Sequence, residues 1–161
     1  MNRAAAPAAA GPAKASDRMA LARQVGERMF AADRASRELM QMELLVCEPG
    51  RACMRMTVRQ EQLNGHDLCH GGFIFTLADS TFAFACNSHN QVTVAAGCSI
   101  EFLRPAILGD VLTCEGVEQT LQGRHGVYDM RVRNQNNELV ALFRGKSTAL
   151  KGMVVPQGDS A

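Results

Sequence analysis

A single acidic side chain, Asp79, stands in a long apolar segment and is the first candidate for chemistry. It is the only charged residue between Gly71 and Cys86. Removing a carboxylate from water is costly, so such a group is paired, protonated or placed in a cleft. In a cleft, Asp79 is expected to act as a general base or as a nucleophile. The alternative is structural: Asp79 caps a neighbouring loop or forms an ion pair with an arginine.

The sequence His70-Gly71-Gly72 precedes the same segment and provides a second candidate element. Glycines at the start of a helix let another molecule approach the backbone closely. The N–H groups of the first turn carry the positive end of the helix dipole, which binds an anion or stabilises an oxyanion on a carbonyl. Taken alone, the motif is equally compatible with an ordinary helix-entry turn.

The spacing of these two elements predicts a site that two chains share. Gly71 and Asp79 are eight residues apart, which corresponds to about 12 Å along a helix axis. Reacting atoms must come within about 3–3.5 Å of their catalytic groups. One helix therefore does not easily present both groups to one carbon atom. We expect Gly71 of one chain to face Asp79 of another across a two-fold interface between antiparallel helices, in an obligate dimer.

Histidine and cysteine side chains suggest a metal site as an alternative. The candidate ligands are His66, Cys69 and His70 before the apolar segment, and Cys86 and His89 at its end. A helix of about 15 residues is about 22 Å long, which keeps the two groups from converging on one ion within a chain. The sequence therefore predicts no metal site.

The apolar segment itself is predicted to be a helix, residues 73–86, that is buried on all sides. Ser16 and Asp17 are expected to cap an N-terminal helix that extends to about residue 35. The polar and glycine-rich residues 64–72 are predicted to form a loop. These elements would place the two chemical motifs at the start and in the middle of one central helix.

Six strand-like runs accompany this helix. They span residues 40–47, 52–59, 91–102, 110–121, 126–133 and 138–150, with turn signals such as Pro49-Gly50 between them. Short connections favour an antiparallel sheet, and an all-apolar helix is buried only if that sheet curls around it. The predicted fold class is α+β, with one domain over residues 16–152. Residues 1–15 and 153–161 are expected to be flexible tails.

The composition excludes several classes of protein. The chain has 161 residues, 47% of them hydrophobic, and a net charge of +1. This balance gives no electrostatic footprint for nucleic acid or an anionic membrane surface, and no apolar run approaches the roughly 20 residues needed to cross a bilayer. The six cysteines form no Cys-x-x-Cys pair and are expected to be reduced, in a cytoplasmic protein. The N-terminal Ala/Pro run lacks the apolar core of a signal peptide.

Residues 64–79, with the sequence NGHDLCHGGFIFTLAD, resemble the signature of the hotdog-fold acyl-CoA thioesterases. The match is to the phenylacetic acid degradation type, the (hydroxy)phenylacetyl-CoA thioesterases. The resemblance continues through FAFACNS (82–88), FLRP (102–105), GVYD (126–129) and ALFRGKS (141–147). It covers about residues 20–150, nearly the whole chain.

This resemblance implies a hotdog fold, in which an antiparallel sheet wraps around a central helix. It implies dimers that pair into homotetramers, and no metal or prosthetic group. The implied reaction is hydrolysis of an aryl-acetyl-CoA thioester, phenylacetyl-CoA or hydroxyphenylacetyl-CoA, to the free acid and CoA. The chain would then act in phenylacetate catabolism.

The resemblance also implies roles for individual residues. Asp79 corresponds to the catalytic aspartate, which activates water or attacks the thioester, and the N–H of Gly71 polarises the thioester carbonyl. Asn64 helps to place the water or the carbonyl, and His70 shapes the same turn. Asp67 stands where many relatives have a glycine, which alters the loop and adds a second acid.

Binding of coenzyme A requires cations for its phosphates. Basic residues lie in or near the late strands at Arg104, Arg124, Arg144, Lys146 and Lys151. Arg144 and Lys146 share one face of a strand with a period of two, and we expect them to neighbour the phosphates. The alternative for each is a solvated outer face.

A non-hydrolytic hotdog protein, either an acyl-CoA-binding regulator or a dehydratase, remains the alternative function. Dehydratases of this fold usually use a histidine with an acid at other positions, and His70 with Asp67 would imitate that pair. The match at Leu77-Ala78-Asp79 favours hydrolysis. The sequence contains no Gly-x-Ser-x-Gly elbow, which argues against a serine hydrolase.

Overall fold

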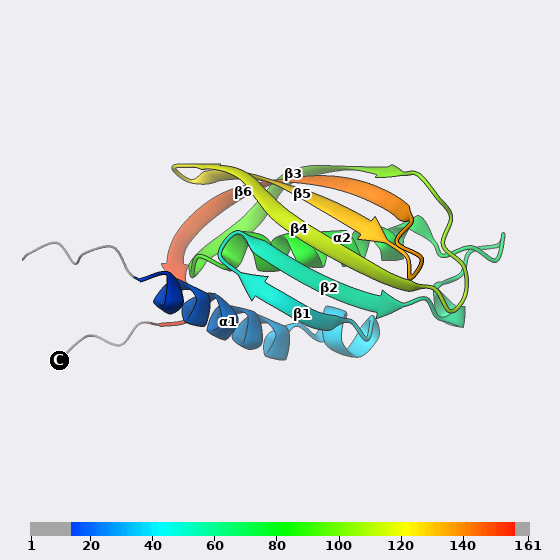
Figure 1. Ribbon diagram of the computed structural model, residues 1–161, viewed down its shortest axis with the longest axis horizontal. Helices are drawn as coiled ribbons and strands as arrows, with labels where there is room; N and C mark the ends of the chain where they lie inside the picture. The colour runs from blue at the N-terminus through cyan, green and yellow to red at the C-terminus, as the bar shows by residue number, and fades with distance from the viewer. Residues whose placement is uncertain (1–13, 157–161) are drawn as a thin grey trace, which may run out of the picture.

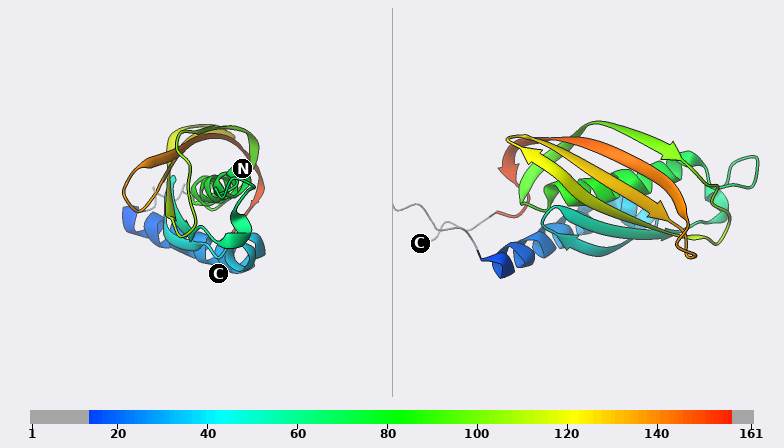
Figure 2. Two further views of the ribbon diagram at one scale, coloured as in Figure 1. Left: turned by 90° about the vertical axis from the view of Figure 1, so that its right-hand side faces the viewer. Right: turned by 45° about the horizontal axis from the view of Figure 1, so that its top comes forward.

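A six-stranded antiparallel sheet curls around one central helix (Figure 1), as the sequence predicted. The computed structural model describes residues 14–156. The strand order is β1-β2-β4-β5-β6-β3. The strands are β1 (Glu43–Glu48), β2 (Arg51–Thr57), β3 (Gln91–Phe102), β4 (Val111–Gln122), β5 (His125–Arg133) and β6 (Leu139–Met153). Seen end-on in Figure 2, the sheet wraps around the helix and leaves the N-terminal helix outside. This is the hotdog arrangement.

The central helix α2 spans Gly71–Asn87 and begins two residues earlier than predicted. The cause is a side-chain cap: His70 Nδ1 accepts a hydrogen bond from the Gly72 N–H at 3.0 Å. A cap of this kind satisfies one of the N–H groups left open at a helix start. Both glycines of the motif therefore belong to the first turn rather than to the loop.

The N-terminal helix α1 spans Ala15–Ala32, and its predicted cap is wrong. Lys14 is the residue at the cap position and makes no side-chain hydrogen bond there. Ser16 and Asp17 lie inside the first turn, where Ser16 Oγ donates to Asp17. The helix also ends earlier than residue 35, and a short π-helix, η1 (Ala35–Leu39), follows it. The second short helix is a 3-10 turn, η2 (Gln60–Gln62), in the connection between β2 and α2.

The strands agree with their predicted ranges to within a few residues, and β3 agrees fully. The largest differences are that β1 begins at Glu43 and that β6 continues to Met153, which pairs with Gln91 of β3. Beyond β6, Val155 exchanges two hydrogen bonds with the side chain of Asn90. Residues 14, 15 and 153–156 thus belong to the described structure rather than to the predicted tails. The rest of the tail prediction, residues 1–13 and 157–161, lies outside the described residues.

The core lies between α2 and the concave face of the sheet. Its largest fully buried side chains include Phe82 and Phe84 of α2 and Tyr128 of β5. The Phe82 ring lies 5.5 Å from that of Tyr128 and 5.9 Å from that of Phe143, measured between centroids. Such aromatic contacts add to the stabilisation from burial alone. This packing fixes α2 relative to the sheet, and so fixes the positions of Gly71 and Asp79.

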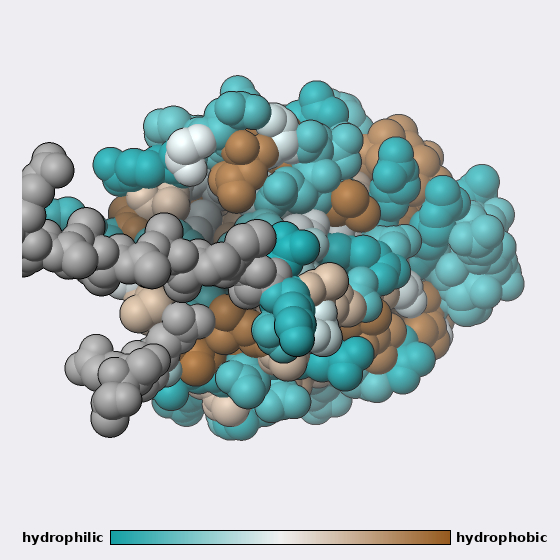
Figure 3. Space-filling view, turned by 60° about the vertical axis from the view of Figure 1, so that its left-hand side comes forward, coloured by the Kyte–Doolittle hydropathy of each residue, from teal (hydrophilic) through white to brown (hydrophobic). Residues whose placement is uncertain are grey.

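The surface is mixed rather than uniformly polar. Figure 3 shows one end of the molecule, where apolar side chains form separate patches among hydrophilic ones. All six cysteines are free thiols, as expected from their spacing. None of the helices in residues 14–156 is long and apolar enough to cross a membrane.

Candidate active site

Asp79 lies in the middle of α2 and is half-buried. Its neighbours along the helix on the buried side, Leu77 and Ala78, are fully enclosed. Among residues 14–156 the Asp79 carboxylate has neither an ion-pair partner nor a hydrogen bond to another side chain. Burial raises the pKa of this carboxyl above its ordinary value, because the charged form loses hydration. Within the described part of the chain, Asp79 therefore neither pairs with an arginine nor caps a loop through a side-chain hydrogen bond.

The first turn of α2 presents an open N–H group at Gly71. The Gly72 N–H is taken by the ring of His70, and the Phe73 N–H donates to the His70 carbonyl at 2.9 Å. The Gly71 N–H has no acceptor among the described residues. A Cβ atom at Gly71 would lie 3.0 Å from Cζ of Phe102, so the ring would have to move by a few tenths of an ångström to admit a side chain there. Gly71 thus offers a donor at the positive end of the helix.

The loop before α2 is organised by Asn64. Its Oδ1 accepts hydrogen bonds from the N–H groups of His66 at 2.9 Å and Leu68 at 3.3 Å. The Asn64 Nδ2 group donates to none of the described residues, which leaves it available to a ligand. Asn64 therefore shapes the loop through Oδ1, and its Nδ2 group can still donate a hydrogen bond to a ligand.

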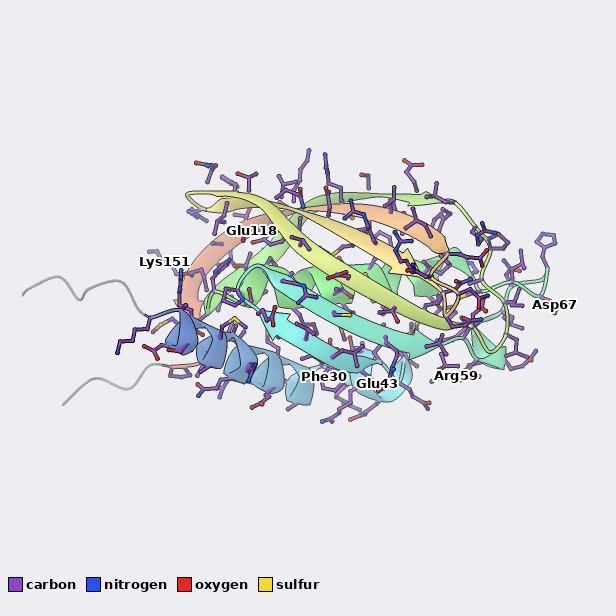
Figure 4. All side chains as sticks on the ribbon, in the orientation of Figure 1. Phe30, Glu43, Arg59, Asp67, Glu118 and Lys151 are labelled. Atoms are coloured by element: carbon purple, nitrogen blue, oxygen red, sulfur yellow. The ribbon has the colours of Figure 1, made fainter. Side chains whose placement is uncertain are left out.

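Asp67 adopts the left-handed backbone conformation, with φ of 56°. Glycine reaches this region without strain, and aspartate is among the side chains that tolerate it. Asp67 is therefore compatible with a position at which the family resemblance implies a glycine. The side chain lies at the exposed tip of the loop (Figure 4) and makes no hydrogen bond to His70. The histidine–acid pair that a dehydratase would need is therefore not formed here.

Asn64 and Gly71 line one cavity of about 350 Å³ at the N-terminal end of α2. The other lining residues are Leu68, Cys69, Ile74 and residues 102–105, which begin at the last residue of β3. Phe102 and Arg104 thus join the site, although sequence reasoning gave Phe102 no role and did not favour Arg104. The signals for them were their place in the FLRP segment of the family resemblance and, for Arg104, its place among the basic residues considered for the CoA phosphates. Arg104 Nη1 lies 3.4 Å from a carboxylate oxygen of Glu138 at the surface.

Asp79 does not line this cavity. It lies eight residues further along α2, about 12 Å from Gly71 along the helix axis. A single chain therefore presents two half-sites: an N–H donor with Asn64 at the start of α2, and an unpaired carboxylate in the middle of α2. Each half lacks what the other provides.

The predicted phosphate-binding cations lie elsewhere. Arg144 and Lys146 share the outer face of β6, because the residues that alternate with them, Phe143, Gly145 and Ser147, are the buried ones. Two hydrogen bonds, of 2.6 and 2.7 Å, join the Arg144 guanidinium to the Asp129 carboxylate and lower the pKa of Asp129. Lys146 is exposed and forms no ion pair within the described part of the chain. Neither residue lines the cavity of Asn64 and Gly71.

The metal alternative receives no support from the side chains. In the described range 14–156, no group of three or more potential ligands could hold an ion. His66 and His70 lie at the start of α2, and His89 lies beyond its end, where Nε2 is 2.8 Å from Glu118. The same Glu118 oxygen accepts a hydrogen bond from the buried Tyr128 hydroxyl, also at 2.8 Å. His89 is thus part of a structural network.

Comparison with known proteins agrees with this geometry. The Thioesterase superfamily matches residues 66–141. The acyl-coenzyme A thioesterase PaaI of Escherichia coli is 46% identical over 118 residues, which cover 70% of this chain and 81% of that protein.

Solved structures show the same similarity. The structure of the E. coli PaaI protein, from the phenylacetic acid degradation operon, has a TM-score of 0.78 and 39% identity, and the match covers 83% of this chain and 98% of that one. A protein from Streptococcus pneumoniae described as a hypothetical thioesterase, solved with coenzyme A, has a TM-score of 0.66 and 26% identity, and the match covers 70% of this chain and 90% of that one.

Proposed function

The chain belongs to the thioesterase superfamily, and on that basis we propose that it is an acyl-CoA thioesterase that hydrolyses aryl-acetyl-CoA to the free acid and CoA. Phenylacetyl-CoA and hydroxyphenylacetyl-CoA are the proposed substrates, within phenylacetate catabolism. The observation that carries the proposal is the half-buried carboxylate of Asp79, which has no partner among the described residues. The similarity to the PaaI thioesterase of E. coli supports the choice of substrate class.

The reaction needs one base and one oxyanion donor. Asp79 takes a proton from water, and the resulting hydroxide attacks the thioester carbonyl carbon. The negative charge that develops on the carbonyl oxygen is stabilised by the Gly71 N–H at the positive end of α2. The C–S bond then breaks, the CoA thiolate leaves and takes up the proton that Asp79 removed from water, and the acid is released with Asp79 again ionised. Asn64 orients the water or the carbonyl, and His70 positions Gly71 by capping the helix.

We propose that the active site lies between two chains, with Gly71 from one chain and Asp79 from the other. The edge strand β3 supports this assembly, since one of its edges is unpaired and Val94 to Ser99 are exposed. Pairing two copies through β3 would extend the sheet and bring two α2 helices together in antiparallel orientation. The midpoint between Gly71 and Asp79 is Phe75, which would then lie near the two-fold axis. We propose that two such dimers form a homotetramer.

Coenzyme A is the proposed partner molecule, and the S. pneumoniae protein solved with coenzyme A supports it. Lys146, with an unpaired and exposed ammonium group, remains a proposed neighbour of the phosphates. Arg144 is the weaker candidate because Asp129 already neutralises its charge. Six free thiols support the proposed cytoplasmic location, where cysteines stay reduced.

Release of free CoA from phenylacetyl-CoA, followed with a thiol reagent, tests the proposal. The wild type should release CoA, and Asp79→Asn should reduce kcat by about 10²–10⁴-fold, the usual range for a general base. A series of aryl and straight-chain thioesters would define the acyl preference. Binding of phenylacetyl-CoA without release of CoA would refute hydrolysis and favour the acyl-CoA-binding alternative.

A further inference from the structure

A second cavity, of about 430 Å³, lies on the other flank of the first turn of α2. Its walls come from Ala35, Leu39 and Met40 on one side and from His70, Gly72, Phe73 and Thr76 of the α2 start on the other. Leu39 is 68% exposed. The lining is apolar apart from the His70 ring and the Thr76 hydroxyl, and Thr76 donates to the Gly72 carbonyl at 2.8 Å.

The wall formed by η1 is held firmly in place. Ser36 is buried, and its Oγ hydrogen-bonds to Asp33 at 2.6 Å and to Ser80 of α2 at 3.0 Å. The Leu39 carbonyl accepts a hydrogen bond from the guanidinium of Arg59 at 2.8 Å. Isolated π-helical turns in proteins are frequent at functional sites. Here the Ser36–Ser80 hydrogen bond fixes η1, which carries the exposed Leu39, against α2, which carries the candidate catalytic groups.

The cavity adjoins the Gly71 half of the proposed shared site. Gly72, which lines it, is the residue next to Gly71. Thr76, at its other end, is three residues before the Asp79 of the same chain, which in the proposed dimer serves the second site. A thioester carbon held between Gly71 and the Asp79 carboxylate of a partner copy would therefore have this apolar space within reach of its acyl arm.

The chemistry of the lining favours an aromatic group. The rings of His70 and Phe73 are edge-on to each other, with centroids 6.4 Å apart. The Met40 thioether sulfur accepts a hydrogen bond from the Gln62 side-chain amide, with 3.9 Å between Nε2 and Sδ. Aromatic rings and sulfur both make favourable contacts with an aryl ring. A straight alkyl chain would gain burial here but none of these contacts.

We infer that this cavity is the acyl-binding pocket, that it receives the aryl ring of the substrate, and that Leu39 and Phe73 determine acyl specificity. The inference rests on the proposed thioesterase function and adds the location of the acyl group. Leu39 is the informative position, because its exposure means that a substitution there does not disturb the core.

The test compares Leu39→Trp, which fills the pocket, and Phe73→Leu, which removes a ring, with wild type. Leu121→Trp is the matched control, because Leu121 is 41% exposed and lies near the distant β4–β5 turn. We measure kcat/KM for phenylacetyl-CoA, octanoyl-CoA and acetyl-CoA. Leu39→Trp should lower kcat/KM for phenylacetyl-CoA by about tenfold or more, the scale on which a hydrophobic pocket discriminates. Acetyl-CoA, whose methyl group does not reach Leu39, should change by less than about twofold.

Equal effects on all three substrates, or no effect on any, would overturn the assignment of the pocket while the thioesterase function stands. If the wild type hydrolyses no thioester, the proposed function fails, and binding still tests the pocket. Calorimetry in the Asp79→Asn background then compares phenylacetyl-CoA with free CoA. Leu39→Trp should weaken binding of phenylacetyl-CoA alone, and equal affinity for both ligands would again refute the assignment.

Discussion

Two inactive variants should restore activity when combined in one dimer. The first variant is Asp79→Asn, which removes the base. The second is Gly71→Val, whose Cβ would lie 3.0 Å from the Phe102 ring and whose methyl groups would fill the space in front of the Gly71 N–H. Because about 12 Å separates the two positions along α2, Gly71 and Asp79 of the same chain do not form one site, and each variant homodimer should be inactive.

The expected magnitude follows from two-fold symmetry. A heterodimer of the two variants contains two possible sites. One site combines Gly71→Val with Asp79→Asn and is inactive, whereas the other combines an intact Gly71 with an intact Asp79. The purified heterodimer should therefore have about half of the wild-type kcat per dimer.

Co-expression with two different affinity tags and sequential purification isolates the heterodimer, and CoA release from phenylacetyl-CoA is then measured. Gly65→Val serves as the matched control for the glycine substitution, since no other atom lies within 4 Å of a Cβ at Gly65. It should retain wild-type activity in the homodimer. Activity of the heterodimer no greater than that of the two variant homodimers would refute the shared site, provided that neither variant unfolds at a lower temperature than the wild type.

Three further predictions concern pH, binding and stability. Burial raises the pKa of Asp79 above its ordinary value of 3.8, so the folded state binds this proton more readily than the unfolded chain, and stability falls as pH rises from 3.8 through the raised pKa. Asp79→Asn should accordingly raise Tm at pH 7. A lower Tm would contradict the finding that the Asp79 carboxylate has no partner among the described residues. The kcat/KM of the wild type should fall as the pH drops through the raised pKa of Asp79. Lys146→Glu should raise KM for phenylacetyl-CoA several-fold but leave KM for the N-acetylcysteamine thioester unchanged. Equal changes in the two KM values would show that Lys146 does not neighbour the CoA phosphates. Tyr128→Phe deletes the hydroxyl that donates to Glu118 and should cost about 1 kcal/mol, seen in calorimetry as a Tm lower by about 2–4 °C; an unchanged Tm would show that the bond is energetically neutral.

Local sequence patterns predicted most of the architecture. The apolar spacing of residues 73–86 indicated a buried helix, and α2 occupies Gly71–Asn87. Alternating patterns and turn residues indicated six strands, all of which are present. Element ends were less accurate, as at Ser16, since an end depends on which competing hydrogen bond forms.

Part of the candidate site was also accessible from sequence. Asp79 was conspicuous as the one charge in an apolar segment, and the family resemblance indicated Gly71, Asn64 and His70. The signal for η1 was absent, because a π-helical turn is stabilised by the distant contact between Ser36 and Ser80 rather than by local propensity. Leu39 therefore entered the argument only through its exposure and its place in a cavity.

The sequence by itself determined the central helix, its single acid, the glycines at its start and the antiparallel sheet around it. Only the tertiary structure decided that Asp79 has no partner among the described residues, that Phe102 lies against Gly71, and that Asp129 neutralises Arg144. The physical reason is range. Periodicity and capping are set by neighbours within a few residues, whereas Gly71 and Phe102 are 31 positions apart and meet because the sheet register and the packing of α2 bring them together.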